Sequence, residues 1–501
     1  MRRVWRIALA GVLSVVPACT SGPPPFPQAT LSVDTDLPVP QLASRLRVDV
    51  YDERGAWRSS RDFAVRDARD FPASFALFFP AEGRTGDVLV RLRLRPDDAD
   101  RDYRGERYRA FPAGDAPADA VVHAPAGDDA PRLMVNGADV TPPFEPLPEI
   151  TVDRLVRVRL TPGVTARPRV TMHASCMGRM ANLADGTSCI DADHPYEPTG
   201  TGDGEDDGRP SAAGTSLALD AMEPPPPPPS AVAVRGGGLV LGGSDLGVGL
   251  PATQVAPTFP PRAAFVRGFA IDREEVSVAR LRAALAAGFA PGAGLNANDG
   301  PLATSAADSR ASCTYRSAPD PADPGREALP LTCVGFAVAR AFCRREAGDL
   351  PTEAQWEYAA ALSGRAHKTR YPWGNDTPTC EGIVFARSDQ AVAGSTGCHD
   401  RGFPFGLRDA ATVDVDITPD GIRDLAGGAS EWVRGAPFAY DSACYLRAGL
   451  VDPLCDAPST EHVLRGGSFT SNEAGLAATS RGRVPAGGST PTIGFRCVYE
   501  R

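Results

Sequence analysis

The sequence predicts two domains: an N-terminal all-β, sandwich-like domain over residues 28–195, and a C-terminal α+β domain over residues 236–501 with little regular secondary structure. Three observations predict this organisation. The first half alternates apolar and polar residues with a period of two. Residues 196–235 are rich in acidic residues, glycine and proline, which indicates a linker. The second half carries helix-capping signals followed by stretches dense in glycine and aromatic residues.

Size and charge limit the classes of function. A chain of 501 residues is long enough for two or three domains. Its 51 glycines and 49 prolines favour loop-rich architecture. The net charge is −10, and nucleic-acid binding needs clustered lysine and arginine, so no nucleic-acid partner is expected.

The N-terminus predicts export. Three arginines precede the apolar run of residues 7–16, which is too short to span a bilayer, so residues 1–18 are interpreted as a signal peptide. Residues 16–19 read Val-Pro-Ala-Cys and resemble a lipobox, which predicts an acylated Cys19 and a tether over residues 19–27. The alternative is a cleaved signal peptide without lipid, because proline is unusual inside a lipobox. The expected location is the cell envelope, anchored by lipid to the outer membrane or cell surface.

The β region alternates clearly at residues 45–50, 88–94 and 155–160. Alternation predicts one buried and one solvated face, with the arginines in water. No site is predicted here. Three nearby acids are interpreted as a solvated turn: Asp97, Asp98 and Asp100.

The predicted linker contains an acidic, glycine-rich stretch at residues 202–208 and a proline run from Pro224 to Pro229. Such a run favours a stiff polyproline II rod. A spacer between domains is preferred over a proline-rich ligand for a binding domain.

Three helices are predicted in the second half. Ser277 caps a helix that continues through Ala287. Residues 334–346 form the next helix. Thr352 and Gln355 form a capping box for a third, which ends near Leu362.

Several strings occur in a fixed order in this half. They are DREEVS at 272–277, LPTEAQWEY at 350–358, YPWGN at 371–375, DLAGGASEW at 424–432, RGGSF at 465–469 and GFR at 494–496. In this order they resemble the formylglycine-generating enzyme (sulfatase-modifying factor) family, whose α+β fold is related to C-type lectins. The rings of five residues within these strings are expected in the core: Trp356, Tyr358, Trp373, Trp432 and Phe495.

The resemblance implies copper-dependent chemistry in the family and the absence of its copper ligands in this chain. Family enzymes bind copper(I) through two cysteines, since thiolates suit a soft monovalent metal. The matching positions here are Ser471 and Leu476, so copper is not expected. This favours a non-catalytic binding or structural module whose partner is an extracytoplasmic protein or a glycan. The alternative is an oxidase or protein-modifying enzyme that uses other residues.

The resemblance also implies a calcium site. The matching positions are Asp424, Gly427, Ala429 and Glu431, which offer the hard oxygens that calcium prefers. The alternative is that Asp424 and Glu431 only cap or salt-bridge this turn.

The chain has eleven cysteines, and ten remain if Cys19 is acylated. An exported protein would hold them as disulfides. Zinc binding is not expected, because the sequence contains no Cys-x-x-Cys motif. The resemblance implies a bond between Cys343 and Cys497. The remaining cysteines are paired by proximity alone: Cys176 with Cys189, Cys313 with Cys333, Cys380 with Cys398, and Cys444 with Cys455.

Overall fold

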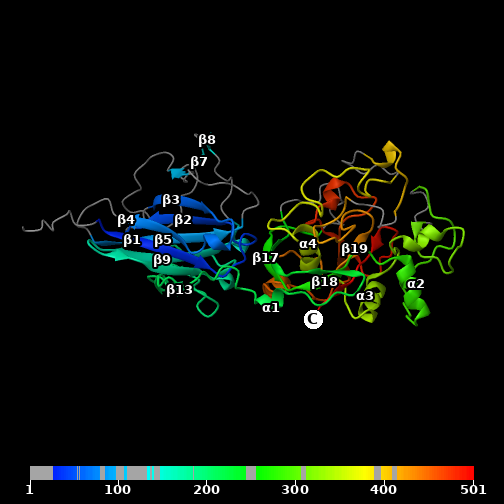
Figure 1. Ribbon diagram of the computed structural model, residues 1–501, viewed down its shortest axis with the longest axis horizontal. Helices are drawn as coiled ribbons and strands as arrows, with labels where there is room; N and C mark the ends of the chain where they lie inside the picture. Colours follow the sequence, from blue (N-terminus) through cyan, green and yellow to red (C-terminus); the bar gives the residue numbers. More distant parts are fainter. Residues whose placement is uncertain are drawn as a thin grey trace, which may run out of the picture.

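The computed structural model describes residues 26–53, 55, 57–78, 85–96, 107–109, 132–135, 138–139, 147–183, 185–243, 256–305, 312–388, 397–408 and 415–500. The predicted signal peptide, Cys19 and the turn acids Asp97, Asp98 and Asp100 lie outside these residues. The chain forms two bodies that lie end to end (Figure 1). In the part described, no helix is long and apolar enough to cross a membrane.

The N-terminal body contains two facing sheets. One has the strand order β3-β2-β5-β9, with every pair antiparallel. Its strands are β2 (Arg45–Tyr51), β3 (Trp57–Ala64), β5 (Gly86–Arg95) and β9 (Val152–Leu160). The other sheet has the order β10-β1-β11-β14, and β4 pairs with β1. Its strands are β1 (Gln28–Thr35), β4 (Ala73–Phe78), β10 (Thr165–Ala166), β11 (Pro168–Met172) and β14 (Gly204–Glu205).

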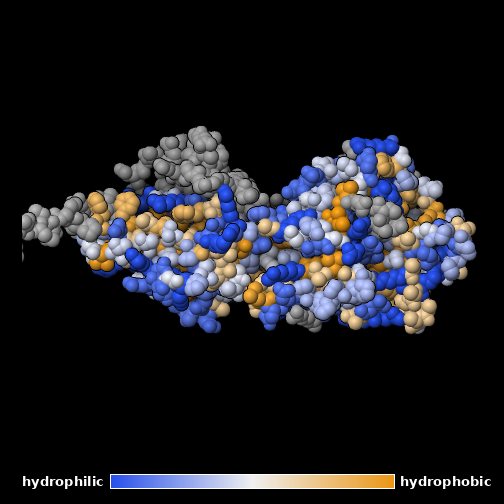
Figure 2. All heavy atoms as spheres, viewed as in Figure 1, coloured by the Kyte–Doolittle hydropathy of each residue, from blue (hydrophilic) through white to orange (hydrophobic). Residues whose placement is uncertain are grey.

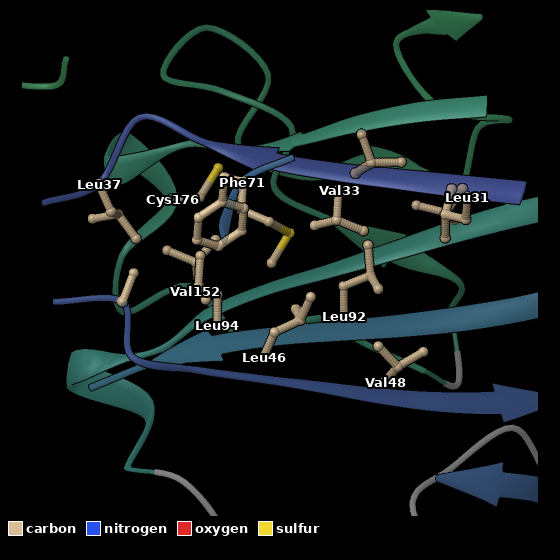
Figure 3. Packing of buried hydrophobic residues seen from close by; sticks show 14 of the residues in the cluster. Leu31, Val33, Leu37, Leu46, Val48, Phe71, Leu92, Leu94, Val152 and Cys176 are labelled. Carbon is tan, nitrogen blue, oxygen red and sulfur yellow. The ribbon is translucent and has the colours of Figure 1, made fainter. Parts of the chain in front are cut away.

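The core of this body fills the space between the sheets (Figure 3). Leu31 and Val33 of β1 point toward Leu46 and Val48 of β2, because alternate residues of each strand face inward. The smaller elements are η1 (Ala68–Asp70), β6 (Arg107–Arg109), β7 (Arg132–Val135), β8 (Ala138–Asp139), η3 (Pro148–Ile150), η4 (Ala174–Cys176), β12 (Thr187–Ser188) and β13 (Glu197–Pro198).

The polar face of sheet β3-β2-β5-β9 differs from the prediction. Arginines expected in water are buried: Arg45 and Arg93 are each 1% exposed, and Arg91 is 7% exposed. Burial is tolerated because each guanidinium meets a buried carboxylate from a neighbouring strand. The pairs are Arg45 with Asp62, Arg93 with Asp49 and Arg91 with Asp153.

The segment predicted as a linker, residues 196–235, is folded onto both bodies. Strand β14 pairs with β11 of the N-terminal body, and β15 (Ala231–Val234) pairs with β18 (Phe269–Asp272) of the C-terminal body. Helix α1 (Leu219–Met222) lies between them along the chain. The composition of this segment predicted a free spacer. The segment is folded nevertheless, because main-chain strand pairing and hydrogen bonds such as that from Ala212 N–H to Asp34 do not require apolar side chains.

The predicted helices are present in the C-terminal body. They are α2 (Val278–Ala286), α3 (Phe336–Arg345) and α4 (Glu353–Ala361). A further short helix, α5 (Ala443–Arg447), was not predicted. Ser277 caps α2 by accepting from Arg280 N, and Thr352 with Gln355 forms the predicted capping box of α4. The 3-10 helices are η7 (Pro324–Ala328), η8 (His399–Arg401) and η10 (Glu473–Leu476).

Three small sheets complete this body, with orders β15-β18-β23, β16-β17 and β21-β20-β19-β22. Their remaining strands are β16 (Gly237–Leu241), β17 (Arg262–Val266), β19 (Ser430–Trp432), β20 (Glu461–Arg465), β21 (Gly482–Pro485), β22 (Ile493–Gly494) and β23 (Val498–Tyr499). Helix α4 lies against β16 and β17, so its motif residues face the centre of the body.

The two bodies share a hydrophobic junction. Ala263 and Phe265 of β17 belong to the same buried cluster as Leu37 and Leu42 of the N-terminal body. A Cβ on Gly238 of β16 would lie 3.0 Å from the Leu42 side chain, so the two bodies pack closely there. The junction therefore fixes the C-terminal body at one end of the β domain.

All five cysteine pairs expected from the sequence are disulfides in the structure. Cys343 of α3 and Cys497 beside β23 lie 5.3 Å apart between Cα atoms and are separated by 154 positions in the sequence. This bond joins an early helix of the domain to its last strand.

Candidate functional site

The family strings meet in one buried polar network. The indole Nε1 of Trp356 donates to Glu431 Oε2 at 2.8 Å. Arg496 Nε donates to both oxygens of the same carboxylate, at 2.8 and 2.9 Å. All three residues are at most 1% exposed. LPTEAQWEY, DLAGGASEW and GFR are therefore joined through one carboxylate.

A second set of ion pairs joins α4 to the RGGSF turn. Arg481 binds Glu353 at two points, with Nε–Oε2 at 2.7 Å and Nη2–Oε1 at 2.8 Å. Arg465 bridges Glu353 and Glu357 at 3.1 and 3.0 Å. Burial opposes ionisation of Glu353, but the guanidiniums of Arg481 and Arg465 outweigh it and lower its pKa. Lys368 also binds Glu357, at 2.6 Å.

Most of the predicted core rings are buried. Trp356, Trp432 and Phe495 are fully buried, and Tyr358 is 8% exposed. Trp373 departs from the prediction because it is only half-buried and lies at the surface. Its ring stacks on Tyr371 with a centroid distance of 4.8 Å, and its Nε1 donates to Asp376 O.

Ser471 occupies a structural position in the turn that follows β20. Its hydroxyl accepts a hydrogen bond from Ser468 N at 2.9 Å, and its side chain packs against Gly467 and Gly475. A Cβ on Gly467, whose φ is +70°, would come within 3.1 Å of the Ser471 hydroxyl. The hydroxyl thus closes a tight turn, and no general base within the described part of the chain holds it in a way that would activate it.

Leu476 lies in an apolar cluster at the end of η10. It is fully buried against Tyr371, Ile383 and Phe385, and the Cys380–Cys398 disulfide belongs to the same cluster. An aliphatic side chain has no donor for a metal, and this one faces other apolar groups. The position where the family has a copper ligand is part of the core here.

No cysteine thiol remains among the residues described. The ten cysteines in this part of the chain are all paired as disulfides. Copper(I) binding by thiolates therefore has no donor in these residues.

The predicted calcium loop adjoins a buried cluster of carboxylates. Glu275, Asp416 and Asp424 are 6%, 1% and 7% exposed, and Glu431 is nearby. Each of the first three has an oxygen without a hydrogen-bond partner among the residues described: Oε2 of Glu275, Oδ1 of Asp416 and Oδ2 of Asp424. The guanidinium of Arg496 acts on each of these three carboxyl groups and lowers its pKa.

Burial makes this cluster difficult to ionise. It raises the pKa of Asp416 to about 7, mainly through desolvation. Desolvation also raises the pKa of Asp424, and the neighbouring Glu275 and Asp416 add to the effect. The pKa of Glu275 is raised by burial and by Glu431. The cluster must be neutralised by protons or by a further cation.

The four predicted calcium positions fit this need in part. Asp424 offers its unpartnered Oδ2, and the main-chain oxygens of Gly427 and Ala429 follow it along the loop. Glu431 forms an ion pair with Arg496 and accepts from Trp356, which is the salt-bridging role given above as the alternative for this residue. Within the described ranges, no three His, Cys, Asp or Glu side chains are arranged to hold one metal ion, so a calcium ion here would depend on main-chain ligands.

Sequence reasoning missed Glu275 and Asp416 as members of this cluster, and Glu353, Glu357, Arg465 and Arg481 as a network. The sequence did contain a signal for Glu353 and Glu357. Glu353 and Glu357 are four residues apart on a helix otherwise rich in alanine and aromatic residues, so they share a face that must be buried. Asp416 lies outside the family strings and carried no signal.

Comparison with known proteins decides the family. The profile of the sulfatase-modifying factor enzyme 1-like domain matches residues 219–501, more than half of the chain. The chain belongs to the sulfatase-modifying factor family. The match begins at α1, so this family's domain includes the second part of the segment expected to be a linker.

The relatives that this sulfatase-modifying factor protein matches have names that denote different functions. A formylglycine-generating enzyme of Thermomonospora curvata is 32% identical over 179 residues, covering 34% of this chain and 55% of that protein. The bovine inactive C-alpha-formylglycine-generating enzyme 2 is 32% identical over 200 residues, covering 36% and 54%. A serine/threonine-protein kinase, pkn1 of Chlamydia pneumoniae, is 29% identical over 176 residues, covering 35% and 25%. The chain thus spans about half or less of the length of these relatives.

Among solved structures, PvdO from Pseudomonas aeruginosa aligns with 54% of this chain and 94% of its own, with a TM-score of 0.38 and 18% identity. CarF aligns with 55% of this chain and 99% of its own, with a TM-score of 0.34 and 18% identity.

Proposed function

We propose that this protein is a lipid-anchored, extracytoplasmic binding or structural module whose sulfatase-modifying factor domain does not make formylglycine. The main support for this proposal comes from the two positions where family enzymes have copper-binding cysteines. Ser471 closes a turn and Leu476 fills the core, while the ten described cysteines are in disulfides. The bovine relative whose name marks it as inactive supports the view that the fold persists without the activity.

Catalytic silence is tested with a cysteine-containing sulfatase-type peptide. The purified protein is incubated with copper(I) and oxygen, and the peptide is analysed by mass spectrometry for conversion of its cysteine to formylglycine. The Thermomonospora curvata enzyme serves as the positive control. No aldehyde product is expected, and aldehyde formed by this protein would refute the proposal.

The anchor is tested separately. We expect mass spectrometry of the membrane fraction to identify acylated Cys19 as the N-terminal residue. A Cys19→Ser variant should leave the membrane fraction. An unmodified N-terminus elsewhere in the wild type would overturn this part of the proposal.

A divalent cation bound at the predicted calcium loop would stabilise the C-terminal domain. Asp424, assisted by the oxygens of Gly427 and Ala429, would hold the ion, and the ion would offset the charge of Glu275 and Asp416. Calcium suits such a site because it binds carboxylate and carbonyl oxygens without a rigid geometry. The role of the ion there would be structural, since Glu431 at the end of the loop binds both Trp356 of α4 and Arg496 of the segment before β23.

A further inference from the structure

Three large apolar side chains are exposed at one end of the N-terminal domain. Phe26 is 48% exposed, Phe78 is 61% exposed and Val164 is 53% exposed. Strand register brings them together, because Gln28 pairs with Phe78 on one side of β1 and with Thr165, the neighbour of Val164, on the other. We call these three residues the apolar tip. Figure 2 shows hydrophobic residues at this left end of the molecule.

The apolar tip lies at the end of the domain away from the C-terminal body. Strand β1 begins at the tip and runs through eight residues, or about 26 Å, toward Leu37 and Leu42 at the domain junction. The C-terminal body is attached at that junction (Figure 1). The β domain therefore separates the tip from the family domain.

We propose that the apolar tip rests on a lipid bilayer. This inference rests on the proposed acylation of Cys19. Six residues lie between Cys19 and Phe26, and even when fully extended the seven Cα–Cα steps from Cys19 to Phe26 span only about 25 Å. A lipid chain on Cys19 would thus keep the start of β1 close to the membrane surface, where phenylalanine side chains can enter the boundary between headgroups and acyl chains.

Charge at this end of the domain is mixed. Arg159 and Arg167 are exposed on either side of the turn that holds Val164, but Asp87 pairs with Arg159 across β5 and β9, and the exposed Glu205 pairs with Pro168, the neighbour of Arg167. Guanidinium groups at this position would approach the anionic headgroups of a bilayer. With the tip on the membrane, the shared hydrophobic junction would hold the C-terminal body away from the surface by the length of the β domain.

The test places a fluorescent reporter at the tip. The acylated full-length variant Phe78→Trp is reconstituted into phosphatidylcholine–phosphatidylglycerol vesicles with and without brominated acyl chains, which quench a tryptophan in contact with them. The matched control is Leu446→Trp, a 69% exposed leucine on α5 of the C-terminal body. Each spectrum is compared with that of the unsubstituted protein, whose native tryptophans supply the background.

We expect at least a twofold drop in the added Phe78→Trp emission and little change for Leu446→Trp. Equal quenching of both reporters, or of neither, would overturn the inference. Analytical ultracentrifugation of a lipid-free sample tests whether the apolar tip instead binds a second copy of this protein. A dimer that the triple variant Phe26→Ser, Phe78→Ser, Val164→Ser abolishes would also overturn it.

A second arm separates this inference from the anchor itself. The Cys19→Ser chain with a histidine tag joined at residue 19 is bound to vesicles that contain a nickel-chelating lipid, so the tether exists whether or not the natural cysteine is acylated. Quenching of Phe78→Trp in this arm supports the tip even if mass spectrometry finds no lipid on Cys19. No quenching here, with acylation confirmed, refutes the tip and leaves the anchor intact.

Discussion

Glu353 at the start of α4 and Arg481 before β21 form a two-point ion pair, with both distances between 2.7 and 2.8 Å and both side chains almost fully buried. The pair joins the LPTEAQWEY helix to the segment that follows the lost copper positions. Among the described residues, the Glu353 side chain meets arginines and tyrosines, so this residue of the LPTEAQWEY string serves the architecture of the domain.

Breaking this pair should be costly. Replacing Arg481 with methionine leaves Glu353 with less compensation in the core, and we expect a loss of about 3–5 kcal/mol in the free energy of unfolding. Urea denaturation measures it. The control is Arg316→Met, which removes a partly exposed pair with Asp320 and should cost less than about 1 kcal/mol. Equal losses for the two variants would contradict the assigned role.

Calcium should raise the melting temperature of the protein, because a ligand bound only by the native state stabilises it by about 2.7 kcal/mol at a hundredfold excess over its dissociation constant. Asp424→Ala should abolish the rise, whereas Asp400→Ala, at a side chain 85% exposed, should not. Differential scanning fluorimetry with calcium or a chelator measures it. If protons neutralise the cluster instead, the chelator will leave the wild-type curve unchanged.

The long disulfide should contribute more than a short one. Removing Cys343–Cys497 as a double alanine variant should cost about 4–5 kcal/mol on the chain-entropy model, because the closed loop is long. Removing Cys444–Cys455, whose residues are 11 positions apart, should cost about 3 kcal/mol or less. Chemical denaturation without reductant compares them, and a larger loss for the short loop would rule out this explanation.

His173 should make stability depend on pH. Its hydrogen bond with Asp36, at 3.0 Å, raises the pKa of His173 in the folded state. The stabilisation is fully present below the unfolded pKa of about 6.5 and is lost as pH rises through the folded value. Melting temperatures between pH 5 and 9 should show this decline.

Two variants check the assignment to His173. His173→Gln should remove this part of the pH dependence. Asp36→Asn should do the same, although its side-chain oxygen can still accept from Ala174 N. A slope that survives both substitutions would assign the pH dependence to other groups.

Much of the C-terminal domain could be predicted because its signals are local or come from the family strings. The capping box at Thr352 and the cap at Ser277 depend on hydrogen bonds between residues three apart, which sequence states directly. The Cys343–Cys497 bond followed from the resemblance. The replacement of both copper ligands, by Ser471 and Leu476, is also visible in the sequence alone.

Only the tertiary structure decided where charge is buried. Alternation assigned Arg45 and Arg93 to one face of a sheet, but it could not say that carboxylates from neighbouring strands would make that face a buried one. Likewise, folding brings Glu275, which is distant in sequence, beside Asp416 and Asp424, which share one turn. Local patterns specify the faces of helices and strands, whereas the neutralisation of a buried charge depends on partners that only the packed chain brings together.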